Sequence, residues 1–204
     1  MRSKKHFGTA LMAVGLILVL AAACLMAYNF WDEDRAERAM TDVLSQLEAL
    51  EEEISADTAT DKEPEYVENP EMEMPALALD SNYYIGILEV PVLGLKLPVM
   101  REWSYPNLKI APNRYTGSAY MSNMVIAGHN YRSHFGSLKN LRVGDQVLFT
   151  DVDGNVFDYR VAETEIVAPT EIEHMTIGDW DLTLFTCTYG GRTRFTVRCV
   201  TKSQ

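Results

Sequence analysis

The hydrophobic pattern of the chain begins with one long apolar run. No charged residue occurs between Phe7 and Trp31, and a helix of about 25 residues crosses a hydrocarbon core of about 30 Å. Basic residues precede the run, and Asp32–Asp34 follow it. The positive-inside rule therefore predicts a cytoplasmic tail at 1–6, a membrane anchor at 7–31 and an extracellular remainder. A cleaved signal peptide is the alternative, although the run is long for the apolar part of such a peptide.

The next stretch, 32–80, is strongly acidic. It has 17 acidic residues against three basic ones, and it accounts for the net charge of −11 of the whole chain. The Pro-containing part at 55–75 predicts a mobile tether. Before it, apolar residues recur with heptad spacing, which predicts either a lone amphipathic helix or weak self-association. This seam over 36–54 comprises Ala36, Met40, Val43, Leu47, Leu50 and Ile54. We therefore interpret 32–80 as an acidic helical or disordered stalk.

Residues 81–204 have the pattern of a folded β domain. Short runs rich in β-branched and aromatic residues are separated by Gly, Pro and Asn, and 168–181 is a longer connection with one helical turn at 170–175. Seven or eight such strands with little helix predict an all-β fold, a closed or nearly closed β-barrel. The domain has 12 acidic and 12 basic residues, so its charge gives no reason to expect nucleic-acid binding.

The last two predicted strands form a hairpin around the Gly-Gly pair at 190–191. With these glycines as the turn residues, Tyr189 faces Arg192 and Cys187 faces Arg194. Directly opposed residues share one face of a sheet, with Cβ atoms about 4.5–5.5 Å apart. A thiol beside a guanidinium suits acyl transfer, because the cation can hold the oxyanion that forms when sulfur attacks a carbonyl.

An earlier strand supplies a proton acceptor for the thiol. The apolar run 122–130 ends in Gly-His-Asn, which places His129 where a strand gives way to a loop. Imidazole titrates near neutral pH and therefore suits proton transfer. His134, in the following loop, is the second choice, and it is also a candidate wall of the cleft. His6 and His174 occupy no comparable position.

These motifs resemble the sortases, membrane-anchored cysteine transpeptidases of Gram-positive bacteria. The family's Thr-Leu-x-Thr-Cys strand is present at 183–187, its histidine after a glycine is matched by His129, and the arginine of its following strand is matched by Arg194. The resemblance covers about 83–200. It implies Cys187 as nucleophile, His129 as general acid/base and Arg194 as the group that stabilises oxyanion and substrate.

Other residues stay open for some of these roles. Arg192 and Arg198 share the face of Arg194, although only Arg194 lies opposite the thiol. The backbone N–H of Thr188 is a second candidate oxyanion donor. Cys199 points to the other face in this register, and we interpret it as a small core residue.

The resemblance also implies a reaction and its partners. A C-terminal signal similar to Leu-Pro-x-Thr-Gly on an exported protein is cleaved through a thioester, and an amine of a peptidoglycan precursor resolves that thioester. Two alternatives are a catalytically silent, membrane-anchored module that binds the cell wall, and another class of cell-wall cysteine transpeptidase. The second class usually carries a Ser-His-Gly-x-x-Cys arrangement, which this sequence lacks.

The connection 168–181 is where sortases build part of the groove for the sorting signal. The apolar candidates for that groove are Ile172, Met175, Ile177 and Trp180. No cofactor or metal is expected, since the four histidines are scattered without carboxylates at ligand spacing. Some relatives bind calcium near this connection, where the carboxylates here are Glu163, Glu165, Glu171 and Glu173.

Overall fold

The computed structural model describes residues 2–57, 63–79, 81–188 and 190–202. It divides into two compact units, Met1–Arg35 and Ala36–Gln204. The first unit is the amino-terminal part of helix α1 (Arg2–Asp57), whose apolar stretch is long enough to cross a membrane. The parts of the predicted stalk at 58–62 and Asp80 lie outside the described residues.

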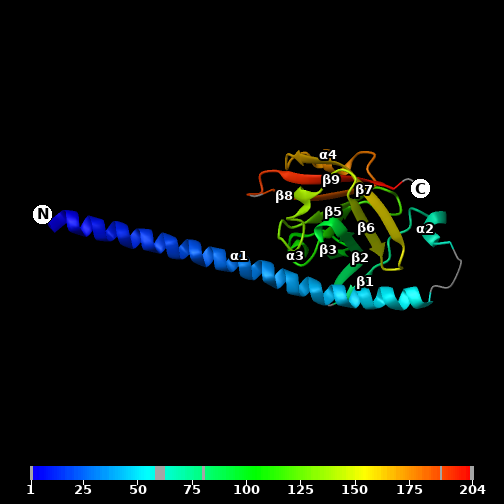
Figure 1. Ribbon diagram of the computed structural model, residues 1–204, viewed down its shortest axis with the longest axis horizontal. Helices are drawn as coiled ribbons and strands as arrows, with labels where there is room; N and C mark the ends of the chain where they lie inside the picture. Colours follow the sequence, from blue (N-terminus) through cyan, green and yellow to red (C-terminus); the bar gives the residue numbers. More distant parts are fainter. Residues whose placement is uncertain (1, 58–62, 80, 189, 203–204) are drawn as a thin grey trace. The chain divides into compact units, whose positions relative to one another are not determined.

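The second unit is built on one nine-stranded sheet within the described part of the chain (Figure 1). The sheet order is β1-β2-β3-β4-β5-β8-β9-β7-β6, and pairing of β2 with β6 closes strands β2–β9 into a barrel. The strands are β1 (Leu77–Leu79), β2 (Asn82–Val90), β3 (Leu95–Met100), β4 (Asn113–Thr116), β5 (Met124–Gly128), β6 (Gln146–Asp151), β7 (Val156–Val167), β8 (Leu182–Cys187) and β9 (Arg194–Thr201). The predicted barrel is confirmed; it is a mixed one, because β3–β4 and β5–β8 are parallel.

Short helices interrupt the strand connections. They are α2 (Glu65–Glu68), α3 (Tyr105–Leu108) and α4 (Ile172–Thr176), with 3-10 turns η1 (Pro91–Leu93) and η2 (Leu138–Asn140). Helix α4 confirms the helical turn that the sequence predicts in the long connection between β7 and β8. Helix α3 and strand β4 lie in 103–116, where the sequence has little regular hydrophobic pattern.

Strands β5, β8 and β9 are covered on both faces, which explains why β8 is buried along almost its whole length. Leu184 and Val197 point into the main core inside the barrel. Phe185, one position along, lies on the outer face, where it packs with Ala127 and with Met175 of α4. Side chains alternate along a strand with a period of two, so residues at odd positions of β5 and β8 point toward this outer face.

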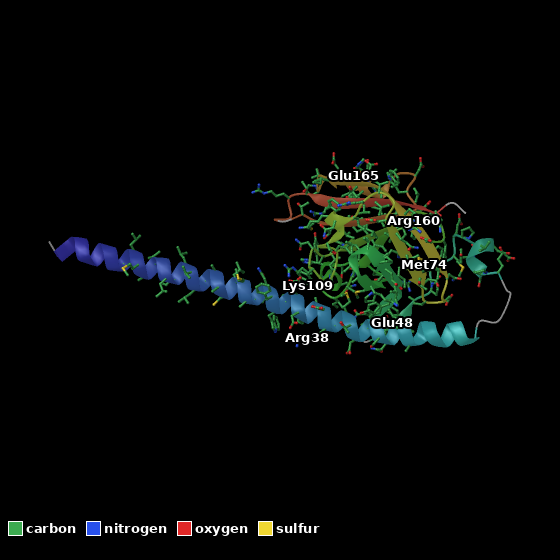
Figure 2. All side chains as sticks on the ribbon, in the orientation of Figure 1. Arg38, Glu48, Met74, Lys109, Arg160 and Glu165 are labelled. Carbon is green, nitrogen blue, oxygen red and sulfur yellow. The ribbon has the colours of Figure 1, made fainter. Side chains whose placement is uncertain are left out.

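The heptad seam of α1 packs on the barrel, which corrects the prediction of weak self-association through this surface. Val43 and Leu47 are buried in a cluster with Ile87 of β2, and Met40 joins the main core. An ion pair of 3.0 Å joins Glu48, which is labelled on α1 in Figure 2, to Lys96 of β3. A seam of under three heptads is short for a coiled coil, and the barrel offers it an apolar surface within the same chain. The side chains of Leu50 and Ile54 lie outside the described residues.

The segment before β2 also belongs to the compact unit. This corrects the domain start predicted at 81 and, for its described part from residue 63 onward, the mobile tether predicted over 55–75. The ring of Tyr66 stacks on Tyr120 with centroids 4.5 Å apart. Met74 is 2% exposed within the main core (Figure 2), and β1 pairs with the start of β2. A few apolar side chains suffice to dock an acidic segment, because each fully buried one contributes about 1.5–3 kcal/mol.

Candidate active site

Cys187 and Arg194 stand opposite each other where β8 ends and β9 begins. They are register partners of the antiparallel pair, as the sequence predicted, and Leu182 pairs with Cys199 at the other end. Beyond them, the N–H of Thr188 donates to the carbonyl of Thr193 over 3.0 Å, and the two hydroxyls lie 2.7 Å apart. These bonds hold the hairpin closed directly beside the thiol.

The turn of this hairpin depends on its two glycines. Gly190 has φ 82° and Gly191 has φ 69°, a left-handed conformation that most side chains disfavour. The N–H of Gly191 donates to the carbonyl of Thr188 over 2.8 Å, which closes the turn. The predicted pair of Tyr189 with Arg192 is not tested, because Tyr189 lies outside the described residues.

His129 follows β5, which runs parallel to β8. Gly128 is the register partner of Thr186. The next residues on the two chains, His129 and Cys187, therefore follow the same pair. Because side chains alternate between the two faces of a strand, the odd positions 129 and 187 both correspond to the outer face. The ring of His129 stacks on Tyr131 with centroids 3.9 Å apart and an interplanar angle of 17°, and its Nδ1 lies 3.0 Å from Oδ1 of Asn130.

A glycine before the histidine is a packing requirement. A Cβ atom at Gly128 would lie 2.4 Å from the ring of Phe135, far inside contact distance. Phe135 is fully buried, and its N–H donates to the carbonyl of His129 over 3.0 Å. The small residue therefore lets Phe135 pack beneath the loop that presents His129.

A pocket of about 230 Å³ opens over the thiol. Cys187, Arg194 and Thr186 line its polar end, and Ile172 and Met175 of α4 line one apolar wall. Of the four groove candidates in the long connection, these two lie at the pocket, whereas Ile177 and Trp180 are not among its lining residues.

The opposite wall is aromatic and was not predicted. Trp103 lies against Tyr105 and Tyr115 with centroids 5.1 Å and 5.5 Å apart, and Tyr115 lies 5.4 Å from Phe185. All four rings line the pocket. Phe185 belongs to β8, and the other three come from the α3–β4 region, whose irregular sequence gave no strand or helix pattern that could have placed them beside β8.

The structure separates the three arginines that the sequence placed on one face. Arg194 lines the pocket, and its Nη1 donates to the carbonyls of Gly191 and Thr193 over 3.2 Å each. Arg192 is exposed on the turn, and Arg198 is buried farther along β9. Arg194 is therefore the arginine beside the thiol.

The backbone of Thr188 does not serve as the second oxyanion donor that the sequence suggested. Its N–H is used by the carbonyl of Thr193 in the hairpin. A ladder hydrogen bond of this kind is broken only at the cost of leaving its partner unsatisfied.

Comparison with known proteins identifies the family. The sortase domain family matches residues 88–203, more than half of the chain. This chain belongs to the sortase family. It is therefore a cysteine transpeptidase, of a family that is membrane-associated and acts on sorting signals, and its apolar helix fits a membrane anchor.

Sortases of several subclasses resemble this one. Sortase A of Bacillus anthracis is 26% identical over 189 residues, which cover 85% of each chain. The solved structure of a Clostridium perfringens sortase D5 transpeptidase covers 78% of this chain and 99% of its own, with a TM-score of 0.57 and 21% identity. Clostridium perfringens sortase C, solved with the C-terminal cell wall sorting motif, covers 80% and 89%, with a TM-score of 0.52 and 24% identity. These relatives leave the subclass of this sortase unassigned.

His134, the second histidine candidate, is fully buried, whereas His129 is half-buried. Its ring lies 5.3 Å from Tyr131, the residue on which His129 stacks. Burial lowers the pKa of His134 to about 4; the charge of His129 acts in the same direction, and the backbone of Ile110 opposes them. A ring that stays neutral and buried suits a supporting role beside Tyr131. Neither His134 nor His129 is among the residues that line the pocket, but Gly128, directly before His129, is.

Cys199 is a core residue of this sortase. It is 0% exposed inside the barrel, and burial raises the pKa of its thiol to about 12. Thiolate is the reactive form of cysteine, so burial makes this sulfur inert. Cys187, by contrast, is partly exposed at the pocket.

Two of the four carboxylates considered for calcium, Glu165 and Glu171, have other partners. Glu165 binds His174 and Arg198, each over 2.8 Å, and Glu171 accepts a hydrogen bond from the N–H of Ala168. Among the residues that the structure describes, no group of three or more His, Cys, Asp and Glu could hold a metal ion. A calcium ion would have to displace these contacts.

Proposed function

We propose that this sortase cleaves a C-terminal signal of the Leu-Pro-x-Thr-Gly type and joins the exported protein to an amine of a peptidoglycan precursor. Cys187 is the nucleophile, His129 the general acid/base and Arg194 the stabiliser of oxyanion and substrate. The register of three strands supports this proposal. Cys187 is paired with Arg194, and both line one pocket. His129 follows Gly128, which lines the same pocket and is the register partner of Thr186, the residue before Cys187.

The first half-reaction forms a thioester. The proton of the Cys187 thiol passes to His129, and the sulfur attacks the carbonyl carbon of the signal's threonine. A C–S bond forms while the carbonyl oxygen becomes an oxyanion. The guanidinium of Arg194 balances that charge inside a pocket with apolar walls, where an electrostatic interaction is stronger than in water. The C–N bond to glycine then breaks, and His129 delivers a proton to the departing amine.

The second half-reaction consumes the thioester. The acceptor amine attacks the acyl carbon, and His129 takes the proton that the amine loses as the C–N bond forms. The C–S bond breaks, and Cys187 is restored. The exported protein leaves with an amide in place of the original peptide bond, so no cofactor or redox partner is needed.

The pocket walls suggest how the signal is held. Ile172 and Met175 on one side and the rings of Trp103 and Tyr105 on the other offer apolar surface to the signal's first residues. Tyr105 is 74% exposed, so its ring is available to a ligand without rearrangement of the core. Apolar walls around a few polar groups are typical of ligand sites.

Membrane topology is part of the proposal. Residues 7–31 anchor the protein, 1–6 stay in the cytoplasm, and the barrel lies outside the cell, where exported proteins and wall precursors meet. The basic residues before the apolar run and the acidic ones after it support this orientation. Protease added to intact protoplasts should remove the barrel and spare the amino terminus; protection of the barrel would reverse the orientation.

The enzymatic test is a transfer assay with the full chain in detergent. A panel of signal peptides is incubated with the protein and an amine acceptor, and products are separated and weighed by mass spectrometry. Transfer to the amine that disappears in Cys187→Ala is the expected result. Labelling of Cys187 by a thiol-reactive signal analogue without any transfer product would instead favour a catalytically silent binding module.

A further inference from the structure

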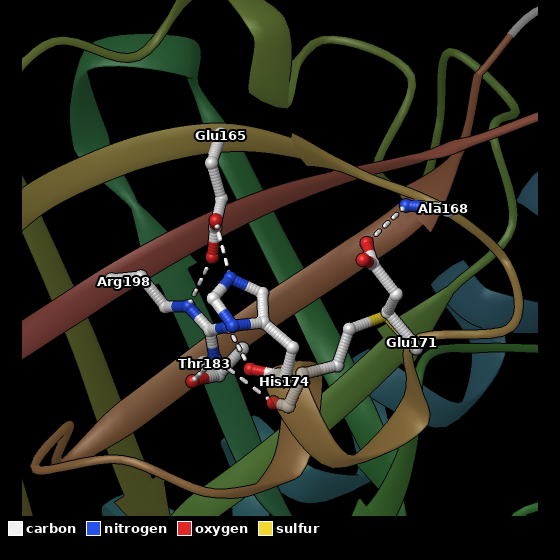
Figure 3. Close-up of polar contacts among 7 residues, drawn as sticks. Glu165, Ala168, Glu171, His174, Thr183 and Arg198 are labelled. Carbon is white, nitrogen blue, oxygen red and sulfur yellow. Dashed lines mark hydrogen bonds and ion pairs between the residues drawn. The ribbon is translucent and has the colours of Figure 1, made fainter.

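Arg198 is a buried arginine that ties four elements together. It is 2% exposed on β9, and its Nε donates to Oε1 of Glu165 on β7 over 2.8 Å. Its Nη1 donates to Oγ1 of Thr183 on β8 over 3.1 Å and to the carbonyl of Met175 on α4 over 2.9 Å. Its Nη2 donates to the carbonyl of His174, also on α4 (Figure 3). The strands of the barrel thereby hold α4 through one side chain.

Helix α4 needs such support. It has five residues, and a helix this short is not stable by itself in water. The last carbonyls of a helix have no intrahelical donor, and the carbonyls of His174 and Met175 receive theirs from Arg198. A cation at this end also interacts favourably with the negative end of the helix. Arg198 thus acts as a cap for α4 supplied by a distant strand.

Glu165 makes the burial of this arginine tolerable. A buried charge without a partner is strongly destabilising, and Glu165 supplies the opposite charge. Burial raises the pKa of Glu165. Hydrogen bonds from His174 and Arg198, together with the charges of these two residues, lower it by more, so the pKa lies below its usual value. The carboxylate is ionised at neutral pH, and it also binds Nε2 of His174 on α4.

Helix α4 forms one wall of the pocket over the thiol. Met175 is 3% exposed, and its side chain packs against Phe185 and Val167 while lining the pocket. Ile172 lines the same wall. Arg198 and Glu165 themselves are not among the lining residues, so they act on the pocket only through α4.

We propose that Arg198 and Glu165 are positioning residues that hold the α4 wall and thereby set the selectivity of this sortase for the apolar residues of its signal. The proposal rests on the proposed function. The pair fixes where Met175 and Ile172 stand relative to Cys187, and it touches neither substrate nor reacting atoms. Loss of the pair therefore affects recognition of the signal more than the chemistry at the thioester.

The test uses variants that separate positioning from folding. Arg198→Lys keeps the positive charge. The compact ammonium group of lysine cannot reproduce the donors of the guanidinium, which bind four acceptors on β7, β8 and α4. The double variant Arg198→Met with Glu165→Gln leaves no buried charge, and such replacements are often neutral for stability. The control is Arg160→Gln on β7. It removes a partly exposed ion pair, in which Arg160 lies 3.6 Å from Asp158.

Hydrogen exchange reads the position of α4 without any substrate. In a folded double variant, amides of 172–177 should exchange at least about tenfold faster than in wild type, while those of β8 and β9 stay unchanged. Arg160→Gln should leave both unchanged. Unaltered exchange over 172–177 in the folded double variant would overturn the proposal.

Steady-state kinetics read the consequence for selectivity. Arg198→Lys and the double variant should raise KM for the preferred signal peptide by about fivefold or more and narrow the kcat/KM ratio between peptides with large and small apolar residues. The rate constant with which hydroxylamine releases a preformed thioester should stay within about twofold of that of wild type. An equal loss of kcat for all peptides, with selectivity unchanged, would show a merely structural role. Wild-type inactivity on every peptide would refute the proposed function, and hydrogen exchange would still decide whether the pair holds α4.

Discussion

Cys187 and Arg194 are directly opposed register partners at the mouth of the β8–β9 hairpin. Their common face is the outer face of the barrel, and the neighbouring positions on that face are buried under α4. The thiol is thus partly exposed at the end of a rigid strand while its surroundings are largely apolar. A fixed cation beside a nucleophile in such a setting is the geometry on which the proposed acyl transfer depends.

The two arginines of the hairpin should differ sharply in importance. Arg194→Lys should lower kcat by about 100-fold or more, because lysine cannot reproduce the directed donors of the guanidinium toward an oxyanion. Arg192→Lys, on the exposed turn, is the matched control and should stay within about twofold of wild type. Both are measured as kcat and KM for signal cleavage. The reverse order of effects would assign the role to Arg192.

The thiols of the barrel should differ in reactivity. Iodoacetamide added to the native protein should modify Cys187 and spare Cys199, whose buried thiol has a pKa of about 12. Peptide mapping by mass spectrometry gives the extent of labelling at each site. Both should react once the protein is unfolded in guanidinium. Labelling of Cys199 in the native state would contradict its place in the core.

His134 should make the protein less stable in mild acid. Its pKa is 6.5 in a model peptide and about 4 in the folded protein, so between these values the unfolded chain binds more protons than the folded one. The free energy of unfolding therefore falls as pH falls from 6.5 to 4, by about 1.4 kcal/mol per pH unit and about 3 kcal/mol in all.

Urea unfolding of wild type and His134→Leu at several pH values tests this prediction. The difference between the two proteins removes the contribution of other titrating groups. The difference in the free energy of unfolding between wild type and variant should shift in favour of the variant as pH falls. It should be constant above pH 7. Parallel curves from pH 7 to pH 4 would mean that His134 is protonated equally in both states.

The acidic segment before the barrel should contribute to stability. Met74→Ala should cost about 2–5 kcal/mol in the free energy of unfolding, since it empties a fully buried position. Met121→Ala is the control, because Met121 is 48% exposed, and it should change the free energy by under about 0.5 kcal/mol. If urea unfolding showed equally small changes in the free energy of unfolding for both substitutions, the segment around Met74 would be a mobile tether, as the sequence predicted.

Local patterns were enough to predict the hairpin. Turn glycines fix the register, and the register fixes which residues oppose each other, so the pairing of Cys187 with Arg194 follows from sequence alone. The alignment of His129 with Cys187 is different, because it depends on β5 lying beside β8. That adjacency joins segments about 60 residues apart, and only the family resemblance indicated it.

Burial by distant elements could not be read from the sequence. Arg198 was placed on the correct face, but its burial arises because α4 crosses that face, and charged residues are rarely buried without a partner from elsewhere. Trp103 and Met74 were missed for the same reason. Each sits in a segment without periodicity, and its partners come from the barrel.

The central claim is that Cys187 carries the acyl group, and mass spectrometry of the trapped intermediate tests it most directly. The full-length protein is mixed with a signal peptide without acceptor amine, quenched in acid and digested. The account predicts an adduct equal to the acyl fragment on the peptide that contains Cys187, released by hydroxylamine and absent from Cys187→Ala. An adduct on another residue, or cleavage by Cys187→Ala at the wild-type rate, would contradict it.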